Sequence, residues 1–134
     1  MTSLDLCYNN LGPTGAAAIA DALKSGMAVL TNLNLAGNQL CGLDRFGRGT
    51  YDASGIKALA SALAGSAVLT DLNLCHNNIG AEGAKAIAEA LGSGRAVLTE
   101  CTLIKNNLDV ESATMLAKIA TEKRIMLSGM KRDQ

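Results

Sequence analysis

Residues 69–91 read LTDLNLCHNNIGAEGAKAIAEAL and contain two different apolar periodicities in succession. In the first half, Leu72 and Leu74 alternate with polar residues, which is typical of a β-strand with one buried face. In the second half, apolar residues recur at the three- and four-residue spacing of one helix face, at Ala84, Ile87, Ala88 and Leu91. The segment therefore predicts one strand followed by one helix.

The same strand and helix pattern occurs four times along the 134 residues. Its strand half follows L-x-x-L-x-L-x-x-N-x-L, and the copies begin at Met1, Leu30, Leu69 and Leu98. The intervals are 29, 39 and 29 residues, so the second copy contains additional residues. A fixed period of this length indicates a solenoid, in which each repeat stacks on its neighbours. We divide the single domain, residues 1–134, into repeats 1–29, 30–68, 69–97 and 98–126, with a partial repeat and polar tail over 127–134.

Polar residues mark the turn that leads from each strand to its helix. One position of the repeat is always asparagine: Asn9, Asn38, Asn77 and Asn106. Because a side-chain amide both donates and accepts hydrogen bonds, we expect these residues to satisfy backbone groups where the chain bends. Residues suited to a helix N-cap form a second column, at Gly12, Asp52, Gly80 and Asp109.

These repeats resemble the ribonuclease-inhibitor-like class of leucine-rich repeats, whose units of about 28 to 29 residues contain the helix half L-G-x-x-G-A-x-A-I-A-x-A-L. That half stands here as LGPTGAAAIADAL from Leu11 and as IGAEGAKAIAEAL from Ile79. The resemblance covers nearly the whole chain. It implies an α/β leucine-rich-repeat solenoid, a right-handed curved coil with parallel strands on the concave face and helices on the convex face. It also implies a protein partner, bound on the concave face or its rim.

The composition excludes several classes of function. Twelve basic residues balance twelve acidic ones, so the chain lacks the positive charge expected of a protein that binds nucleic acid or anionic membranes. No apolar run approaches the roughly 18 residues that a membrane span needs, and the chain does not begin like a secretory signal. We therefore expect an intracellular, cytoplasmic protein that binds no nucleic acid and does not span a membrane.

Catalytic and metal-binding residues are not predicted. His76 is the only histidine, and the adjacent Cys75 points to the opposite side of a strand or into the turn, so the two do not face one substrate. The cysteines form no Cys-x-x-Cys pair, and no carboxylate cluster suggests a metal. We predict no enzyme activity, no cofactor and no metal site.

The residues of the concave face follow from the alternation along each strand, because side chains between the strand leucines point to that face. They are polar, with acidic residues in one column and Tyr, His and Lys in another, which suits a protein epitope better than a small-molecule pocket. The predicted partner-binding residues are Tyr8, Asn32, Asn34, Asp71, Asn73, His76, Glu100 and Lys105. The alternative is an ordinary solvated sheet face.

The extra residues of the second repeat lie at about 41–51 and read CGLDRFGRGTY. They include the only Phe, one of the two Tyr, and two Arg, which are residue types enriched at binding hot spots. We predict that this loop also binds the partner, through Arg45, Phe46, Arg48 and Tyr51. The alternative is that Phe46 and Tyr51 pack the loop against the coil and that Arg45 pairs with Asp44 or Asp52.

Together these observations predict a non-catalytic protein–protein interaction scaffold, which is an accessory subunit of a larger assembly. In that assembly, we expect the exposed edge of the first repeat to be covered by a partner, by a second copy of the chain, or by further sequence of the same protein. Two alternatives stay open. One is a regulator of a small GTPase, similar to the GTPase-activating protein of Ran, and the other is the recognition fragment of a sensor receptor.

Overall fold

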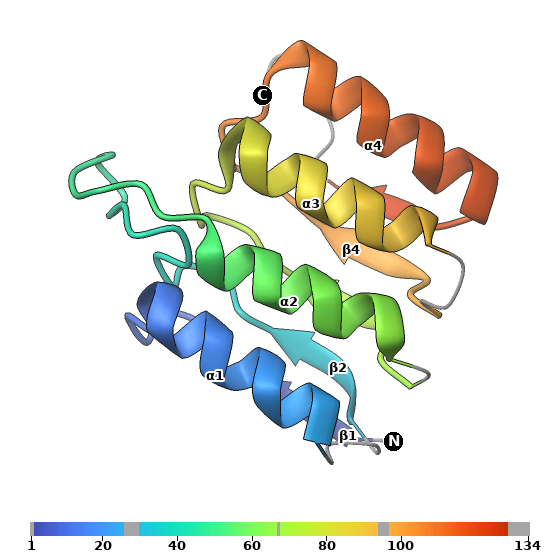
Figure 1. Cartoon of the computed structure of the whole chain (residues 1–134), viewed down its shortest axis with the longest axis horizontal. Coiled ribbons are helices and arrows are strands. Elements are labelled where there is room, and N and C mark those ends of the chain that lie inside the picture. The colour runs from blue at the N-terminus through green and yellow to red at the C-terminus, as the bar shows by residue number, and fades with distance from the viewer. Residues whose placement is uncertain (1, 26–29, 67, 94–96, 129–134) are drawn as a thin grey trace.

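Strands and helices alternate along the chain in the computed structural model, which describes residues 2–25, 30–66, 68–93 and 97–128 (Figure 1). The strands in these ranges are β1 (Thr2–Asp5), β2 (Leu30–Asn34), β3 (Asp71–Asn73), β4 (Glu100–Thr102) and β5 (Met126–Ser128). The helices are α1 (Gly12–Ser25), α2 (Ser54–Gly65), α3 (Gly80–Gly92) and α4 (Val110–Lys123). Each of β1 to β4 is followed by one helix, as the repeat pattern predicts.

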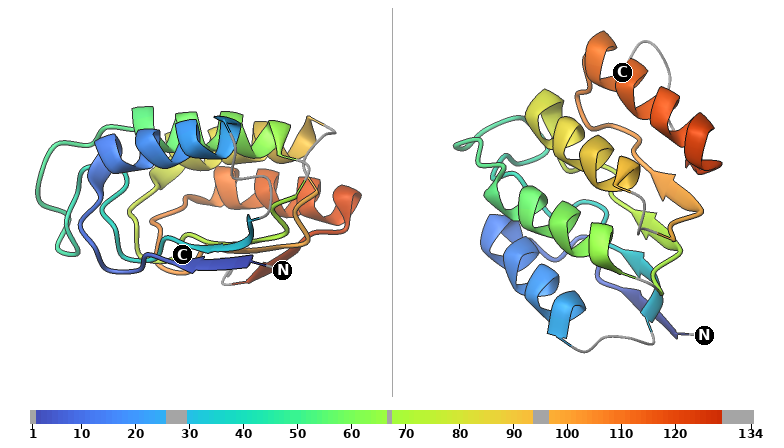
Figure 2. Two further views of the ribbon diagram at one scale, coloured as in Figure 1. Left: turned by 90° about the horizontal axis from the view of Figure 1, so that it is seen from below. Right: turned by 45° about the vertical axis from the view of Figure 1, so that its right-hand side comes forward.

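The strands form one parallel sheet in chain order, β1-β2-β3-β4-β5. The helices lie side by side in a second layer that covers one face of this sheet, and the other face is left open (Figure 2). The predicted α/β solenoid, with parallel strands on one face and helices on the other, is confirmed. We call the uncovered side the sheet face, since it is the surface that the sequence predicts to be concave.

Pairing across the sheet follows the repeat. Leu33 pairs with Leu4 on one side and with Leu72 on the other, and Leu72 pairs with Cys101. Cysteine therefore takes a leucine position in the fourth repeat. The extra residues of the second repeat leave this register intact, because they depart from the coil after β2 and return before α2 (Figure 1).

The position of β5 differs from the sequence prediction. A partial repeat that begins at residue 127 would set Leu127 opposite Leu98, whereas in the structure Leu127 pairs with Cys101. The strand comes early because α4 ends at Lys123, and the left-handed backbone of the following Arg124, with φ of 58°, returns the chain to the sheet directly. Residues 129–134 of the predicted tail lie outside the described residues.

The interior between the two layers is aliphatic and forms one continuous cluster. Leucines from the strands and turns meet isoleucine and alanine from the helices, and nearly fully buried examples are Leu35, Ile56, Leu74, Ile87 and Leu91. Burial decreases at the first repeat because no described element covers its outer side. The partly buried side chains there are Leu4, Leu6, Leu11, Ile19 and Leu23.

The asparagine column forms a hydrogen-bonded ladder through the coil. Oδ1 of Asn38 accepts from the backbone N–H of Asn9 at 2.8 Å, and Oδ1 of Asn77 accepts from that of Asn38 at 2.9 Å. The next step, from Asn77 to Oδ1 of Asn106, is also 2.9 Å. The amide nitrogens of Asn38 and Asn77 donate to carbonyl oxygens of the residues that directly follow the strands of their own and the preceding repeat. These contacts satisfy buried backbone groups that water does not reach.

The helix starts agree only in part with the predicted N-caps. Asp109 caps α4, since its side chain accepts a backbone N–H of the first turn at 2.8 Å. Gly12 and Gly80 are instead the first residues of α1 and α3, with φ of 67° and 69°, which glycine adopts without steric cost. Asp52 lies two residues before α2 and accepts the backbone N–H of Ser54 at 2.9 Å.

Candidate functional site

The sheet face contains a shallow hollow of about 320 Å³ across β1 to β4. The structure brings together there five of the predicted partner-binding residues: Asn32, Asn34, Asp71, Asn73 and Glu100. These residues are half-buried, and they alternate with leucines that point toward the helices. Three further polar residues, Ser3, Asp5 and Thr102, and three leucines, Leu4, Leu33 and Leu72, complete the lining. The hollow therefore presents a grid of polar groups on a rigid sheet.

The charge of the sheet face is negative. Asp71 and Glu100 lie opposite each other on β3 and β4, and Asp5 lies on β1. The described strands contain no lysine or arginine. Like charges directly opposite on neighbouring strands repel one another, so Asp71 and Glu100 make this part of the sheet face electrostatically unfavourable for an anion.

Asn34 and Asn73 also shape the turn that follows each strand. Oδ1 of Asn34 accepts the backbone N–H of Ala36, and Oδ1 of Asn73 accepts that of Cys75, both at 3.0 Å. Nδ2 of each asparagine donates to no atom of the described residues, so both amides can still donate to a partner. Asp5 occupies the same position in the first repeat. Hydrogen bonds from Cys7 lower the pKa of the Asp5 carboxyl group.

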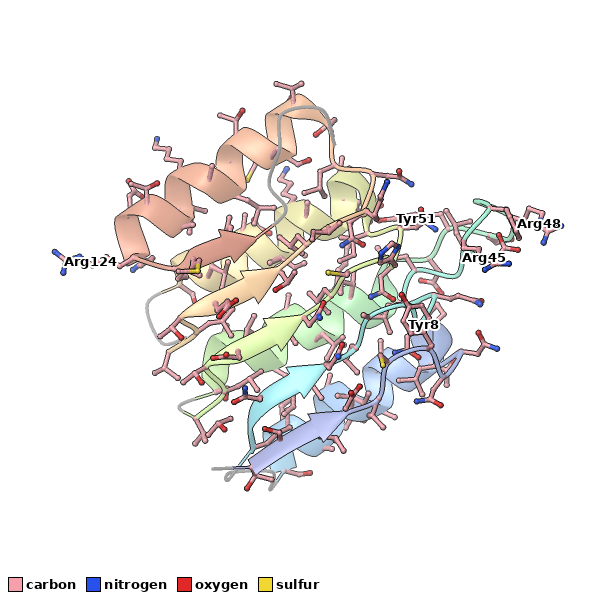
Figure 3. All side chains as sticks on the ribbon, turned by 180° about the vertical axis from the view of Figure 1, so that it is seen from behind. Tyr8, Arg45, Arg48, Tyr51 and Arg124 are labelled. Carbon is pink, nitrogen blue, oxygen red and sulfur yellow. The ribbon has the colours of Figure 1, made fainter. Side chains whose placement is uncertain are left out.

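A second predicted column runs along the rim where the strands end. Tyr8, Gly37, His76 and Lys105 all have a left-handed backbone, with φ of 56°, 66°, 57° and 62°. A Cβ on Gly37 would lie 2.3 Å from Cε1 of Tyr8, so the ring of Tyr8 occupies the space that a side chain there would take. Tyr8 is nevertheless 68% exposed. It lies on the side of the sheet from which the insertion projects (Figure 3).

We call residues 41–51 the rim loop, because it projects beyond the ends of the strands and helices (Figure 2). Asp44 organises its tip. Oδ1 of Asp44 accepts the backbone N–H groups of Phe46 and Arg48, both at 2.9 Å, and Oδ2 accepts Nε of Arg48 at 3.0 Å. These hydrogen bonds, those from Arg48 above all, lower the pKa of Asp44. The tip is therefore a folded unit held by one carboxylate.

The aromatic residue of the tip is exposed between two arginines. The Cζ atoms of Arg45 and Arg48 both lie 4.9 Å from the centroid of the Phe46 ring, within cation–π range. Phe46 is 66% exposed, so the expectation that it packs the loop against the coil is wrong. The ion pair of Asp44 is with Arg48, so the expectation that Arg45 pairs with Asp44 or Asp52 is wrong as well. Both arginines lie at the outer end of the loop (Figure 3).

Tyr51 differs from the other three predicted loop residues, because it points toward the coil. Its hydroxyl donates to the carbonyl oxygen of Ile79 and accepts the backbone N–H of Gly83 at 3.3 Å. Partial burial raises its pKa to about 12. The structure thus places Tyr51 as the anchor of the loop on α3, where its packing role agrees with the alternative interpretation. Tyr51 points inward because the end of the loop that contains it must rejoin the coil at α2.

The rim loop and the rim column enclose a cleft of about 590 Å³, which we call the rim cleft. Its lining combines two exposed aromatic rings with polar and cationic side chains: Tyr8, Asn10, Gly37, Gln39, Leu43, Asp44, Arg45, Phe46 and His76. The structure therefore joins the predicted Tyr8 and His76 to the predicted Arg45 and Phe46 in one place. Lys105 and Arg48 lie outside this lining, and Tyr51 lies behind it.

Sequence analysis missed the polar residues that support the cleft. Asn10 and Gln39 each come one residue after an asparagine of the ladder in the sequence. Nε2 of Gln39 donates to Oδ1 of Asn10 at 2.8 Å. In the third repeat the equivalent Asn78 donates to the carbonyl oxygen of Asp44 at 2.8 Å, so the rim loop replaces one step of this second ladder. The signal was present in the sequence as a further polar column with Asn10, Gln39, Asn78 and Asn107 in register.

The cysteines occupy structural positions. Cys101 is fully buried in the sheet, and desolvation raises its pKa to about 12. Cys41 is the buried first residue of the rim loop, and burial raises its pKa to about 11. Cys75 is buried whereas His76 is exposed, so these two neighbours do not form a catalytic pair. Within the described ranges no three His, Cys, Asp or Glu side chains come together as metal ligands would.

The comparisons with known proteins agree with this architecture. The family model described as Leucine Rich repeat matches residues 1–20 and 65–88. The human NACHT, LRR and PYD domains-containing protein 5 is 38% identical over 90 residues, which cover 67% of this chain and 7% of that protein. The chain therefore belongs to the leucine-rich repeat proteins, and it spans a small part of the length of this relative. None of the helices described here is both long and apolar enough to cross a membrane.

Proposed function

We propose that this chain is a non-catalytic interaction scaffold that binds a protein partner with the sheet face and the rim loop together. Leucine-rich repeat domains typically mediate protein interactions, which gives the general role. The observation that carries the specific proposal is the rim cleft, where two exposed aromatic rings and an unpaired arginine of the described chain meet the end of the polar sheet face. Exposed aromatic and arginine side chains are the residues most often found at binding hot spots.

The shape of the surface supports a macromolecular partner. The hollow on the sheet face is shallow, and together with the rim cleft it gives a surface that extends from β1 to β4 and out along the rim loop. A small molecule is usually bound in an enclosed, mainly apolar pocket, whereas a protein partner covers a wide surface of mixed polarity. The negative sheet face further supports a partner segment with basic residues over β3 and β4.

Membership in a larger assembly is part of the proposal. The outer apolar side chains of the first repeat are only partly buried, among them Leu6, Ile19 and Leu23. A partner or a second copy of the chain that covers them would complete the aliphatic interior on that side. We include an intracellular, cytoplasmic location in the same proposal. The cysteines of the chain are free, and free thiols are typical of reducing compartments.

Affinity capture from native extract, followed by mass spectrometry, tests the proposed function. The wild-type chain should recover a reproducible set of proteins. The double variant Asp71→Arg and Glu100→Arg, which reverses the charge of the sheet face, should lose them. A control is Lys118→Glu on the exposed side of α4, which should recover the full set. Recovery of the same proteins by all three chains would contradict binding through the sheet face.

A second candidate function is that the chain acts as the recognition segment of a larger protein. The observation that favours it is the human relative, whose name combines leucine-rich repeats with NACHT and PYD domains, and of which this chain matches only 7%. Sequencing of the full transcript separates the two candidates. A reading frame that encodes such domains next to these repeats supports the recognition segment, and a frame limited to the repeats contradicts it.

A further inference from the structure

Resting on the proposed protein-binding function, we propose that the rim cleft is a peptide-binding site for an acidic side chain that stands next to an apolar one. The cleft holds the apolar side chain between Tyr8 and Phe46, and Arg45 pairs with the carboxylate. The occupant is a short extended segment of the partner protein. Four features of the structure support this chemistry.

The first feature is the pair of exposed rings. Tyr8 and Phe46 are 68% and 66% exposed although both line the same cleft, with Leu43 half-buried beside them. Covering apolar surface that is otherwise held open to water stabilises a complex. Gly37 makes this arrangement possible, because any side chain there would displace the ring of Tyr8. The cleft is thus kept free for an apolar group that comes from outside the chain.

The second feature is the charge of Arg45. The carboxylate of Asp44 is already used by Arg48 and by two backbone N–H groups of the loop. Arg45 has no ion pair with the described residues, and its Cζ atom lies 4.9 Å from the Phe46 ring centroid. A guanidinium held over a ring keeps its N–H groups available, and its planar fork matches a carboxylate. The ligand should therefore present an anionic group to Arg45, next to the apolar side chain that lies between Tyr8 and Phe46.

The third feature is that the loop is fixed before any ligand binds. Asp44 ties the tip together, Asn78 donates to the Asp44 carbonyl oxygen at 2.8 Å, and the hydroxyl of Tyr51 joins the other end to α3. Leu43 and Gly49 form an antiparallel bridge between the two arms. A site that is already ordered loses less conformational entropy when a peptide binds.

The fourth feature selects a peptide over a nucleic acid. Exposed aromatic rings with arginine also suit a single-stranded nucleic acid. However, the adjacent sheet face bears Asp5, Asp71 and Glu100 and no cation on the described strands, so a long polyanion that left the cleft in that direction would be repelled. An extended segment with one or two carboxylates at the rim and basic residues over the strands matches both charges.

Selection from a phage library of random dodecapeptides tests the proposal without knowledge of the partner. Three baits are used: the wild-type chain, Arg45→Glu, and Lys118→Glu as a matched charge change on α4. Wild type and Lys118→Glu should enrich peptides with an apolar residue next to Asp or Glu. Arg45→Glu should lose these peptides or enrich Lys and Arg at the acidic position. Enrichment of the same peptides by all baits, of peptides without an acidic residue, or of none would overturn the proposal.

Fluorescence polarisation then measures the contribution of each half of the site on one enriched peptide, with a decathymidine oligonucleotide as the competing probe. Arg45→Glu and Tyr8→Ala should each weaken the peptide about tenfold, which is roughly 1.4 kcal/mol, and Val110→Ala, an exposed apolar residue on α4, should leave it unchanged. Stronger binding of the oligonucleotide than of the peptide would overturn the choice of ligand.

The outcomes separate this inference from the proposed function. If Arg45→Glu recovers the same proteins from native extract as the wild type while the sheet-face variant loses them, the chain binds proteins but not through the rim cleft. If no chain recovers any protein, the proposed function itself fails, whatever the peptide selection gives.

Discussion

The third repeat and the rim loop are in contact, yet they use their residues in opposite ways. In the third repeat, from β3 through α3, the large apolar side chains are buried, and the turn is held by Asn77 at the centre of the asparagine ladder. In the rim loop the turn is held by Asp44 at the surface, and the large side chains Phe46 and Arg48 are exposed. The comparison leads us to propose that the repeat supplies stability, whereas the insertion supplies recognition.

The largest effect that tests this comparison is expected at the ladder. Asn77→Ala removes an acceptor for two backbone N–H groups and a donor to carbonyl oxygens of two repeats, all of them buried. We expect a loss of about 3 to 5 kcal/mol in the free energy of unfolding, because each unsatisfied buried group costs about 1 to 3 kcal/mol. Urea denaturation followed by circular dichroism measures it. Asn32→Ala on the sheet face is the control, and equal losses in the two variants would contradict the role of the ladder.

The next effect compares an apolar residue of each region directly. Ile87 is 1% exposed between the layers, and its change to Ala should cost about 2 to 4 kcal/mol through the cavity that remains. Phe46→Ala should change the free energy of unfolding by less than about 0.5 kcal/mol, as is usual for exposed positions. Thermal unfolding of both variants tests the pair. A large destabilisation by Phe46→Ala would show that the rim loop contributes to the core.

A smaller effect is expected at the junction of the two regions. Tyr51→Phe keeps the ring but removes the hydroxyl that joins the loop to the Ile79 carbonyl oxygen and the Gly83 N–H. We expect a loss of about 1 to 2 kcal/mol, because two hydrogen bonds are removed and each has a usual net value of about 1 kcal/mol. Hydrogen exchange should show faster exchange at the start of α3 and in the loop, with the other helices unchanged. If Tyr51→Phe changed the exchange rates equally across the chain, Tyr51 would not have this anchoring role.

The smallest effect concerns pH at the loop tip. The hydrogen bonds from Arg48 and Phe46 lower the folded pKa of Asp44 below the ordinary value of 3.8. A lowered folded pKa means that the tip is held fully above pH 3.8 and is released as pH falls through the folded value. The NMR shifts of the Phe46 and Arg48 amides should therefore change with a midpoint below 3.8, and Asp44→Asn should abolish that change. A midpoint at or above 3.8 would contradict the hydrogen-bonded tip.

How much the sequence predicts differs between the two regions for a physical reason. Within the repeat, every position has counterparts in the other copies, so periodicity identifies Leu72 as buried, Asn77 as a turn residue and Asp71 as a residue that points to the sheet face. The rim loop has no counterpart, so its residue types indicated binding but not orientation. The inward direction of Tyr51 depends on contacts with α3, and the ion pair of Arg48 with Asp44 depends on the loop backbone.

Two further differences arise where local geometry overrides the period. The early position of β5 follows from the left-handed backbone of Arg124 after α4. A pattern averaged over the repeats does not contain this feature. The rim cleft depends on Gly37, whose missing side chain admits the ring of Tyr8 from the neighbouring repeat. Both effects join residues of adjacent coils at single positions, so they become visible only when the coils are placed in space.

Removal of the insertion tests most directly whether the rim loop recognises the partner while the repeats hold the fold. Deletion of residues 41–51 combined with Asp52→Gly gives Leu40 and Gly55 the same spacing as Leu11 and Gly15 in the first repeat. We predict a variant that keeps the helical circular dichroism spectrum and unfolds cooperatively, but no longer recovers the proteins that the wild type captures from native extract. A folded variant with unchanged capture would contradict the account, and so would a variant that does not fold.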